Sequence, residues 1–420
     1  MKEKQIRVRL PLIVYVDWLI FYNAQNQLLS ETIDGDTTSY TYDTAGNIRS
    51  ITGPSISKTF SYNDSGDWKD LLTSVTVNGT TRSITYEEEN GVTIGNPLSY
   101  FNGTQYTLAW QNGRQLASLS GGGKSATYTY GADGIRTRKT VTDSSGTTTY
   151  QYTTQNGQIA RQSWTAGGTA YQMDFIYDAA GRPLAMYYRT KTASQTDFNG
   201  DSYYYETNQQ GDVTGLYKIT YNATTKALTA TRVASYEYDA WGNVTYSTGT
   251  MANINPLKYR GYYHDAESGF YYLQSRYYDP AIGRFVNADD RLSLQTGFFD
   301  MNQFAYCCNN PVNMQDQTGH WSKWNKRLRS ALLNMAKKFL KSISLRKFSG
   351  RHVYRLSNKS NRRPYQGEPG STYRAPNGDT RTYGPDGKPS RDYDHDDHGY
   401  PKTHPHDENG GHSHDWENGV

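Results

Sequence analysis

A short motif that joins an alternating aromatic strand to an Asp-containing turn recurs along the chain, and it restricts the possible folds more than any other feature. The clearest copies occupy residues 40–47, 175–182 and 236–243, and degenerate copies occupy 62–66 and 128–134. Alternation places the aromatic residues on one strand face, the Asp bonds the turn backbone, and the Gly supplies a positive φ. One such step cannot bury its own face, so successive steps must stack or coil into an extended sheet.

The composition agrees with β structure that has polar faces. The chain has 420 residues, enough for two or three domains, and only 35% of them are hydrophobic, but 38 are tyrosine, 12 phenylalanine and 8 tryptophan. Such aromatic side chains pack with one end in water. A β-propeller or a solenoid would share this periodicity, which therefore does not separate these folds.

The consensus sequence of the repeat, Tyr-Asp-x-x-Gly-Asn/Arg, resembles the YD repeats of RHS proteins, insecticidal-toxin C subunits, wall-associated bacterial toxins and teneurins. Residues 255–320 resemble the RHS repeat-associated core, with the block 276–285, then Asn309-Asn310-Pro311, and an Asp-x-x-Gly element at 316–319. The resemblance covers about residues 30–320. It implies a mainly β fold, in which an antiparallel YD-repeat ribbon spirals into a teneurin-like YD-shell that the core plugs. The run is short for the family, so we expect an incomplete, half-open shell from a longer protein.

These features predict four parts of the chain. Residues 1–25 combine basic residues with the apolar run 10–22, which Asp17 interrupts, and this favours a first strand or a truncated start over a secretion signal. Residues 26–254 form the YD/RHS repeats and 255–320 the core plug. Residues 321–420 form a variable, toxin-like domain with a basic helix and a small α+β fold.

The resemblance also implies self-cleavage, because in several family members an aspartate pair in the core cuts the chain behind the Asp-Pro-x-Gly element. The matching positions are Arg284, Asp289 or Asp290, and Asp316. Two close carboxylates can share a proton, so that one acts as base and the other as acid. Asp290 and Gln317 replace the usual prolines, which favours the alternative that these aspartates cap turns in the plug.

The composition changes abruptly after Gly319. The stretch 321–363 has fourteen Lys or Arg residues and no Asp or Glu, and apolar residues recur at three- and four-residue steps, which predicts a basic amphipathic helix of about 25 residues. It could bind nucleic acid, lie on an anionic membrane, or pack on the shell. The predicted nucleic-acid-binding residues are Lys323, Lys326, Arg327, Arg329, Lys337 and Lys338.

The tail of the chain concentrates the groups that can perform acid/base chemistry. Two short strands are predicted at 372–374 and 380–383, with a turn at 385–387, and the last 26 residues then hold six of the nine histidines. One neutral and one protonated imidazole can cleave RNA through its 2′-hydroxyl without a metal. The predicted catalytic residues are His395, His398, His404 and His406, with Arg391 and Lys402 steadying the phosphate.

Three other interpretations of the tail remain open at this point. His412, His414 and Asp394 could hold a divalent metal, zinc or nickel on the imidazoles or magnesium on the carboxylates. His395, Asn409 and His414 occur in the order of a small HNH-like nuclease site. The tail could also be a disordered His/Asp-rich segment that binds metal loosely.

Taken together, the sequence predicts an RHS-type polymorphic toxin for interbacterial competition, in which a β-shell carries a C-terminal effector. The tail resembles toxin tails predicted to be ribonucleases. The expected partners are RNA or DNA of a target cell and a cognate immunity protein, with no integral membrane segment. We expect secretion or display at the cell surface. The alternatives are a non-enzymatic cell-surface scaffold or adhesion protein with an inert tail, and a membrane-active effector that uses the basic helix.

Overall fold

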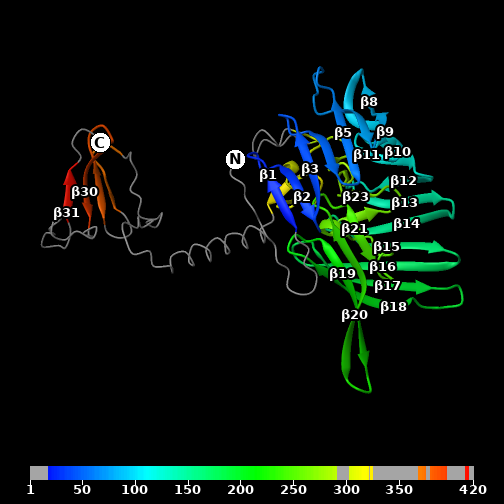
Figure 1. The fold of residues 1–420 in the computed structure, drawn as a ribbon. Coiled ribbons are helices and arrows are strands. Elements are labelled where there is room, and N and C mark those ends of the chain that lie inside the picture. Colours follow the sequence, from blue (N-terminus) through cyan, green and yellow to red (C-terminus); the bar gives the residue numbers. More distant parts are fainter. Residues whose placement is uncertain are drawn as a thin grey trace. The chain divides into compact units, whose positions relative to one another are not determined.

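The structure is a computed structural model, and the chain divides into two compact units, Met1–Leu340 and Lys341–Val420. The first unit consists of antiparallel strands around an irregular core, as the repeat motif predicts (Figure 1). The domain limits predicted from the sequence stay predictions. The described residues are 18–290, 302–320, 322–324, 368–374, 379–394 and 412–415.

The first repeats form a seven-stranded meander in which each strand pairs with the next along the chain. Its first strand lies within the segment expected to begin the sheet. The strands are β1 (Leu19–Tyr22), β2 (Leu28–Ile33), β3 (Asp36–Tyr42), β4 (Ile48–Gly53), β5 (Ile56–Tyr62), β6 (Leu72–Val77) and β7 (Thr80–Ser83).

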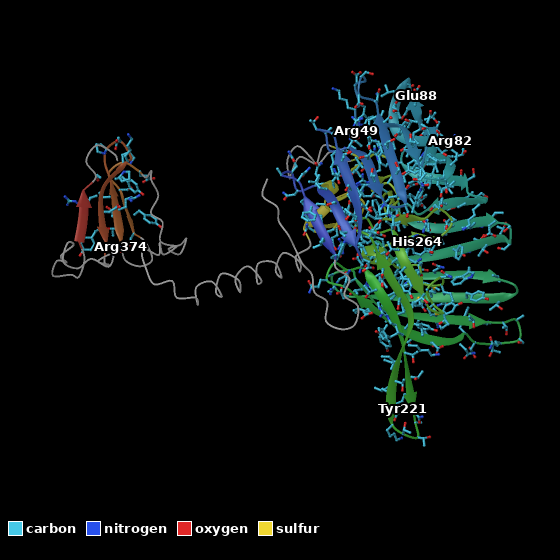
Figure 2. All side chains as sticks on the ribbon, viewed as in Figure 1. Arg49, Arg82, Glu88, Tyr221, His264 and Arg374 are labelled. Carbon is cyan, nitrogen blue, oxygen red and sulfur yellow. The ribbon has the colours of Figure 1, made fainter. Side chains whose placement is uncertain are left out.

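The remaining repeats form a fourteen-stranded meander, again paired in chain order. Its long β19–β20 hairpin extends beyond the neighbouring strands, with Tyr221, 59% exposed, near its tip (Figure 2). The strands are β8 (Thr85–Glu89), β9 (Val92–Phe101), β10 (Gln105–Gln111), β11 (Gln115–Gly121), β12 (Lys124–Tyr130), β13 (Arg136–Asp143), β14 (Gly146–Gln155), β15 (Gln158–Ala166), β16 (Thr169–Tyr177), β17 (Pro183–Lys191), β18 (Asn199–Thr207), β19 (Val213–Asn222), β20 (Ala227–Tyr238) and β21 (Val244–Thr248).

The turn of each repeat is built as its residues predict. Asp43 Oδ1 accepts hydrogen bonds from the backbone N–H groups of Ala45 and Asn47, both at 2.9 Å. Asp178 and Asp239 each bond the backbone in the same two positions of their own turns. Gly46 has a φ of +83°, a conformation that other residues rarely adopt. Each Asp-x-x-Gly sequence therefore forms one tight turn between successive strands.

The second tyrosine of each repeat ties its turn to the preceding one. The Tyr42 hydroxyl donates to the carbonyl of Leu28, at the start of the preceding strand, over 2.6 Å. The bond recurs at the ends of β5, β12, β16 and β20, and a similar bond from β8 reaches the start of β6, two strands back; the distances are 2.8–3.0 Å. A buried hydroxyl needs such a partner. The donors are Tyr62, Tyr86, Tyr130, Tyr177 and Tyr238.

The core segment packs against both meanders. Asn302 Nδ2 donates to Asn47 Oδ1 at 2.7 Å, and Tyr100 donates to Asp279 at 3.0 Å. The rings of Tyr278 and Tyr306, both 0% exposed, stack at 4.0 Å between centroids. The core thus fills the space inside a half-shell. Its elements are η1 (Tyr259–Gly261), β22 (Tyr263–Asp265), β23 (Phe270–Tyr272), β24 (Tyr277–Asp279), β25 (Arg284–Phe285), η3 (Cys307–Asn309) and β26 (Met314–Asp316).

A buried ionic network also joins the core to the longer meander. The Arg136 guanidinium on β13 donates to both carboxylate oxygens of Asp265, at 2.6 and 3.0 Å. Lys139 donates to Asp265 at 2.8 Å and to Glu267 at 2.9 Å. Burial alone would raise the pKa of Asp265, but these two cations hold it below its ordinary value. Removing one member would leave an uncompensated buried charge, so the network fixes the core in one position.

A second buried contact joins the two meanders. Glu31 of β2 accepts hydrogen bonds from Tyr40 Oη at 2.6 Å and from the Ala240 backbone N–H at 2.7 Å. Ala240 lies in the turn after β20, 209 residues away along the chain. Glu31 is 2% exposed, and burial and the neighbouring Asp239 raise its pKa to about 7.

The described part of the second unit is a four-stranded antiparallel sheet, β28 (Thr372–Arg374), β29 (Thr380–Tyr383), β30 (Pro389–Asp394) and β31 (His412–Asp415), paired in that order. The two short strands predicted at 372–374 and 380–383 are confirmed. The predicted turn at 385–387 is also confirmed, because the Gly387 N–H donates to the Gly384 carbonyl at 3.0 Å.

The prediction of a basic helix from residue 321 is wrong at the start of that segment. There β27 (Ser322–Trp324) is a strand that pairs with β26. Pairing with a formed strand outweighs the three- and four-residue apolar spacing there. The rest of the predicted helix lies outside the described residues. Among the described residues, no helix is long and apolar enough to cross a membrane.

Replacing Tyr177 with Phe should lower the free energy of unfolding by about 1 kcal/mol, because the Ile159 carbonyl loses its hydroxyl donor while the ring stays. Urea unfolding measures this change. Tyr204→Phe is the matched control, since Tyr204 is 45% exposed. Equal stability of both variants and the wild type would contradict the role assigned to the second tyrosine.

The Glu31 contact predicts a pH dependence of stability. A carboxyl whose pKa is raised to about 7 by folding binds its proton more tightly in the folded chain, so its contribution is present at low pH and lost as the pH rises. Relative to Glu31→Gln, the wild type should lose on the order of 2 kcal/mol of unfolding free energy between about pH 5 and pH 8. If the unfolding free energies of the two proteins changed in parallel with pH, Glu31 would not titrate in this way.

Candidate functional site

The Arg276 side chain contacts two aspartates at the end of the core. Its guanidinium, 5% exposed, lies 2.9 Å from Asp289 Oδ2 and 3.8 Å from Asp316 Oδ2. Burial lowers the pKa of Arg276, and the neighbouring aspartates oppose that effect. The carboxylates are themselves buried, with Asp289 6% and Asp316 2% exposed. A buried guanidinium beside two buried carboxylates offsets part of the cost of removing these charges from water.

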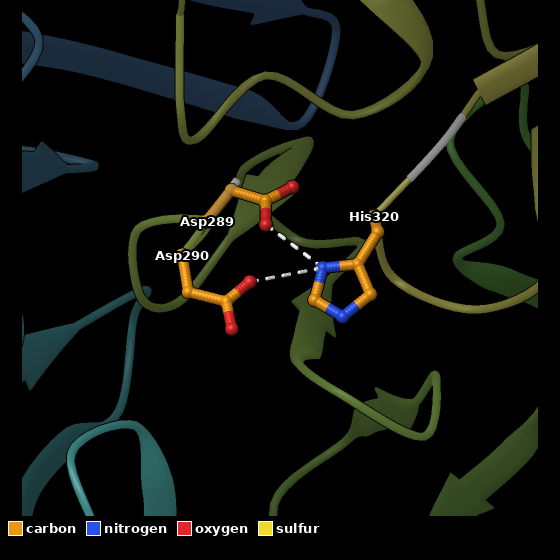
Figure 3. Close-up of side chains that lie close together, drawn as sticks. All are labelled: Asp289, Asp290 and His320. Atoms are coloured by element: carbon orange, nitrogen blue, oxygen red, sulfur yellow. Dashed lines mark hydrogen bonds and ion pairs between the residues drawn. The ribbon is translucent and has the colours of Figure 1, made fainter. Parts of the chain in front are cut away.

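His320 lies beside Asp289 and Asp290 (Figure 3). Its Nδ1 lies 2.8 Å from Asp289 Oδ1 and 3.4 Å from Asp290 Oδ1. Asp290 is more open, with its side chain 56% exposed. Both oxygens of Asp289 are therefore engaged, one by Arg276 and one by His320.

The backbone between Asp316 and His320 is held by the same groups. Asp316 Oδ1 accepts from the N–H of Gly319 at 2.9 Å and of Thr318 at 3.2 Å. Arg276 Nε donates to the carbonyl of Gly319. The guanidinium polarises this carbonyl, as attack on a peptide bond requires, but an aspartate pair also needs one protonated member. The hydrogen bonds to Asp316 are those of an aspartate that caps a turn.

An open cavity of about 500 Å³ adjoins the cluster, lined in part by Arg114, Arg276, Asp290 and His320. Ligand atoms of Asp289, Asp290 and His320 lie within 4.8 Å of one another, a spacing that could hold a divalent cation. The neighbouring Arg276 and Arg114 compete for the same carboxylates, and they disfavour a bound cation.

The structure brings Asp289, Asp290 and Asp316 together, as the implied self-cleavage site requires. It does not bring Arg284 to them, because its guanidinium donates to the Asp70 carbonyl at 3.1 Å and lies over the Phe304 ring. Sequence reasoning missed Arg276 and His320. Arg276 opens the block 276–285 that marked the core, and that position was the available signal.

The predicted residues of the C-terminal domain are described only in part. Arg391 is exposed on β30, Asp394 ends that strand, His412 and His414 lie on β31, and Lys323 lies on β27. The other predicted catalytic and nucleic-acid-binding residues lie outside the described residues. They are His395, His398, Lys402, His404, His406, Lys326, Arg327, Arg329, Lys337 and Lys338.

The chain is similar to several known proteins. The RHS Repeat family model matches residues 22–55. The tRNA3(Ser)-specific nuclease WapA of Bacillus spizizenii is 31% identical over 305 residues, which are 71% of this chain and 12% of that protein. Toxin protein Tse5 of Pseudomonas aeruginosa is 44% identical over 64 residues, 15% of this chain and 5% of that protein. A crystal structure of TcdB2-TccC3 overlaps 76% of this chain and 18% of that chain, at 18% identity and a TM-score of 0.48.

Two meanders built from Tyr-Asp repeats surround a buried core, and this arrangement defines a YD-repeat shell. With the matched repeat and the similarity to WapA, the chain belongs to the RHS-repeat proteins. It spans only 12% of the WapA relative.

The cluster predicts that the chain stays whole, because Asp316 bonds the backbone as a turn-capping aspartate and both oxygens of Asp289 are engaged by Arg276 and His320. Asp316→Ala should lower the free energy of unfolding by about 1–3 kcal/mol through loss of its two backbone bonds, without changing the band pattern on a denaturing gel. Asp290→Asn is the exposed control. Recovery of the wild type as two fragments that break near residue 320, and of Asp289→Asn as one chain, would establish self-cleavage instead.

Proposed function

We propose that this chain is the shell-and-effector part of an RHS-type polymorphic toxin used in competition between bacteria, and that its C-terminal effector cleaves RNA. The observation that carries the proposal is the 31% identity over 305 residues to a protein named as a tRNA-specific nuclease. Similarity to a named toxin protein over a shorter stretch supports the same class.

The division of the chain supports a carrier with a separate effector. The shell and its core form one compact unit, and the strands β28–β31 belong to another. Shell residues supply packing and turn contacts, whereas the second unit holds most of the histidines of the chain. The two units therefore differ in the chemistry that they can perform.

The proposed reaction uses histidine acid/base chemistry. His395, His398, His404 and His406 supply a base and an acid for cleavage through the 2′-hydroxyl, and no metal is needed. Arg391 and Lys402 steady the phosphate, and the basic segment after residue 321 attracts the polyanion. A divalent metal on His412, His414 and Asp394 is the alternative chemistry.

The proposal implies partners and a location. RNA, or DNA, of a target cell is the substrate, and the producing cell protects itself with a cognate immunity protein. Secretion or surface display would bring the effector to the target cell.

The test is tightly induced expression of the full chain in bacteria, beside a variant with His395, His398, His404 and His406 changed to Ala. The wild type should stop growth and degrade total RNA, and the variant should degrade RNA at least about 100-fold more slowly. His352→Ala, a histidine outside the group, is the matched control and should behave as the wild type does.

Other outcomes would favour the rival functions. Normal growth with intact RNA in every strain would favour a surface scaffold with an inert tail. Growth arrest with intact RNA and leakage of cell contents would favour a membrane-active effector.

A further inference from the structure

The long β19–β20 hairpin extends past the strands on either side of it (Figure 1). β18 pairs with β19 only as far as Lys218, and β21 pairs with β20 only from Ser235 to Tyr238. Among the described residues, the outer part of the hairpin, 219–232, is therefore a two-stranded ribbon, and all of its residues are exposed. A two-stranded ribbon is marginally stable alone, and a third strand stabilises it.

The open edge of β20 is suited to pairing with another strand. It has no charged residue and no proline from Ala227 to Thr231. Folded proteins usually protect an exposed edge with such residues, with a bulge or with a very short strand. Leu228 and Tyr221, direct partners on one face of the ribbon, are 72% and 59% exposed. An open edge beside exposed apolar side chains is typical of a surface to which another strand is added.

The hairpin is basic. Residues 213–236 contain three Lys or Arg residues and no Asp or Glu. Lys218 and Arg232, at the base of the ribbon, form ion pairs with acidic residues of β18 at 2.7 and 2.8 Å. Lys226, in the exposed turn, gives the outer end of the hairpin its positive charge. A strand that carries negative charge would therefore fit this edge best.

The other end of the same sheet is acidic. β8 is the terminal strand there and, among the described strands, pairs with β9 alone. Its last three residues are glutamates, the last two of them are exposed, and no Lys or Arg occurs in residues 83–113. Arg82, which precedes this segment, belongs to β7 of the other meander. Figure 2 shows Glu88 and Tyr221 at opposite ends of the first unit.

We infer that copies of this chain associate head to tail, with β8 of one copy added to the open edge of β20 of the next. β8 has five residues, a length that suits the open segment 227–232. The opposite charges of the two ends favour this pairing and disfavour contact between two like ends. A contact between two different surfaces continues into a row or a ring of copies and does not stop at a two-fold dimer. The inference is independent of the proposed ribonuclease function.

An anionic membrane is the other surface that a basic hairpin with exposed tyrosine and leucine would fit. The open edge favours a protein strand over a membrane. Its backbone N–H and C=O groups can form hydrogen bonds with a neighbouring strand, and the hydrocarbon of a bilayer supplies no such partners.

Sedimentation velocity of the full chain at increasing concentration tests the inference. Species larger than a dimer should form, and the association constant should fall at least about 10-fold between about 0.05 and 0.5 M salt, because salt screens the charges. Replacing Glu88 and Glu89 with Lys makes both ends basic and should weaken association at least about 10-fold. The double variant Asp34→Lys/Asp36→Lys, in an exposed turn elsewhere, makes the same change in charge and should associate as the wild type does.

A second variant separates loss of the contact from loss of the fold. Lys226→Glu/Thr229→Glu makes both ends acidic and should also weaken association when it is alone. An equimolar mixture with the Glu88→Lys/Glu89→Lys chain should associate again, because every acidic end then meets a basic one.

Three results would overturn the inference. They are a wild type that stays monomeric at about 100 μM, association that neither charge reversal weakens, and a mixture of the two reversed chains that stays monomeric. If the wild type bound anionic phosphatidylserine vesicles without self-association, the hairpin would instead be a membrane-contacting element.

Discussion

The hydrogen bond from the second tyrosine of each repeat to the start of the preceding strand is the contact on which the rest of the structure depends. Backbone ladders fix which strands are neighbours, but they leave the position of successive turns open. The tyrosine bond spans 14 residues at Tyr42, Tyr62, Tyr86 and Tyr130, and it holds each turn at a set distance from the last. At Tyr86 it also crosses from the longer meander to the shorter one, since its acceptor Leu72 starts β6.

With the turns fixed, the two meanders enclose a core that is unusually polar. Its polar side chains find partners on both meanders: Asn302 donates to Asn47, and the Arg260 guanidinium donates to the Gln210 carbonyl. Unsatisfied buried groups would be costly, so this core fits inside one arrangement of the surrounding strands. Arg276 then binds the last loop through Asp289, Asp316 and the Gly319 carbonyl. The last loop of the core, up to His320, is thereby held in place.

Local signals allowed prediction of much of this fold. The turns at Asp43 and Asp239 and the short strands of the second unit have their residue signature within a few positions. The helix prediction fails at residues 322–324, because their apolar spacing is helical while their partner strand lies at 314–316. A pattern of spacing contains no information on such a partner.

The site was less predictable, because its members are distant in sequence. The three core aspartates were found through the family resemblance, but Arg276 contacts Asp316 across 40 residues, and no local motif marks that pair. In the second unit, only the register of β30 and β31 shows that Asp392 lies opposite position 414. The histidines themselves were visible at once from their density in the tail.

The central claim is that a YD-repeat shell carries a histidine-dependent ribonuclease. The most direct measurement is the chemistry of the RNA ends produced by the purified full chain in the presence of a metal chelator. The account predicts 2′,3′-cyclic phosphate and 5′-hydroxyl ends that form without metal. Intact RNA, or 5′-phosphate ends that appear only when magnesium is restored, would contradict it.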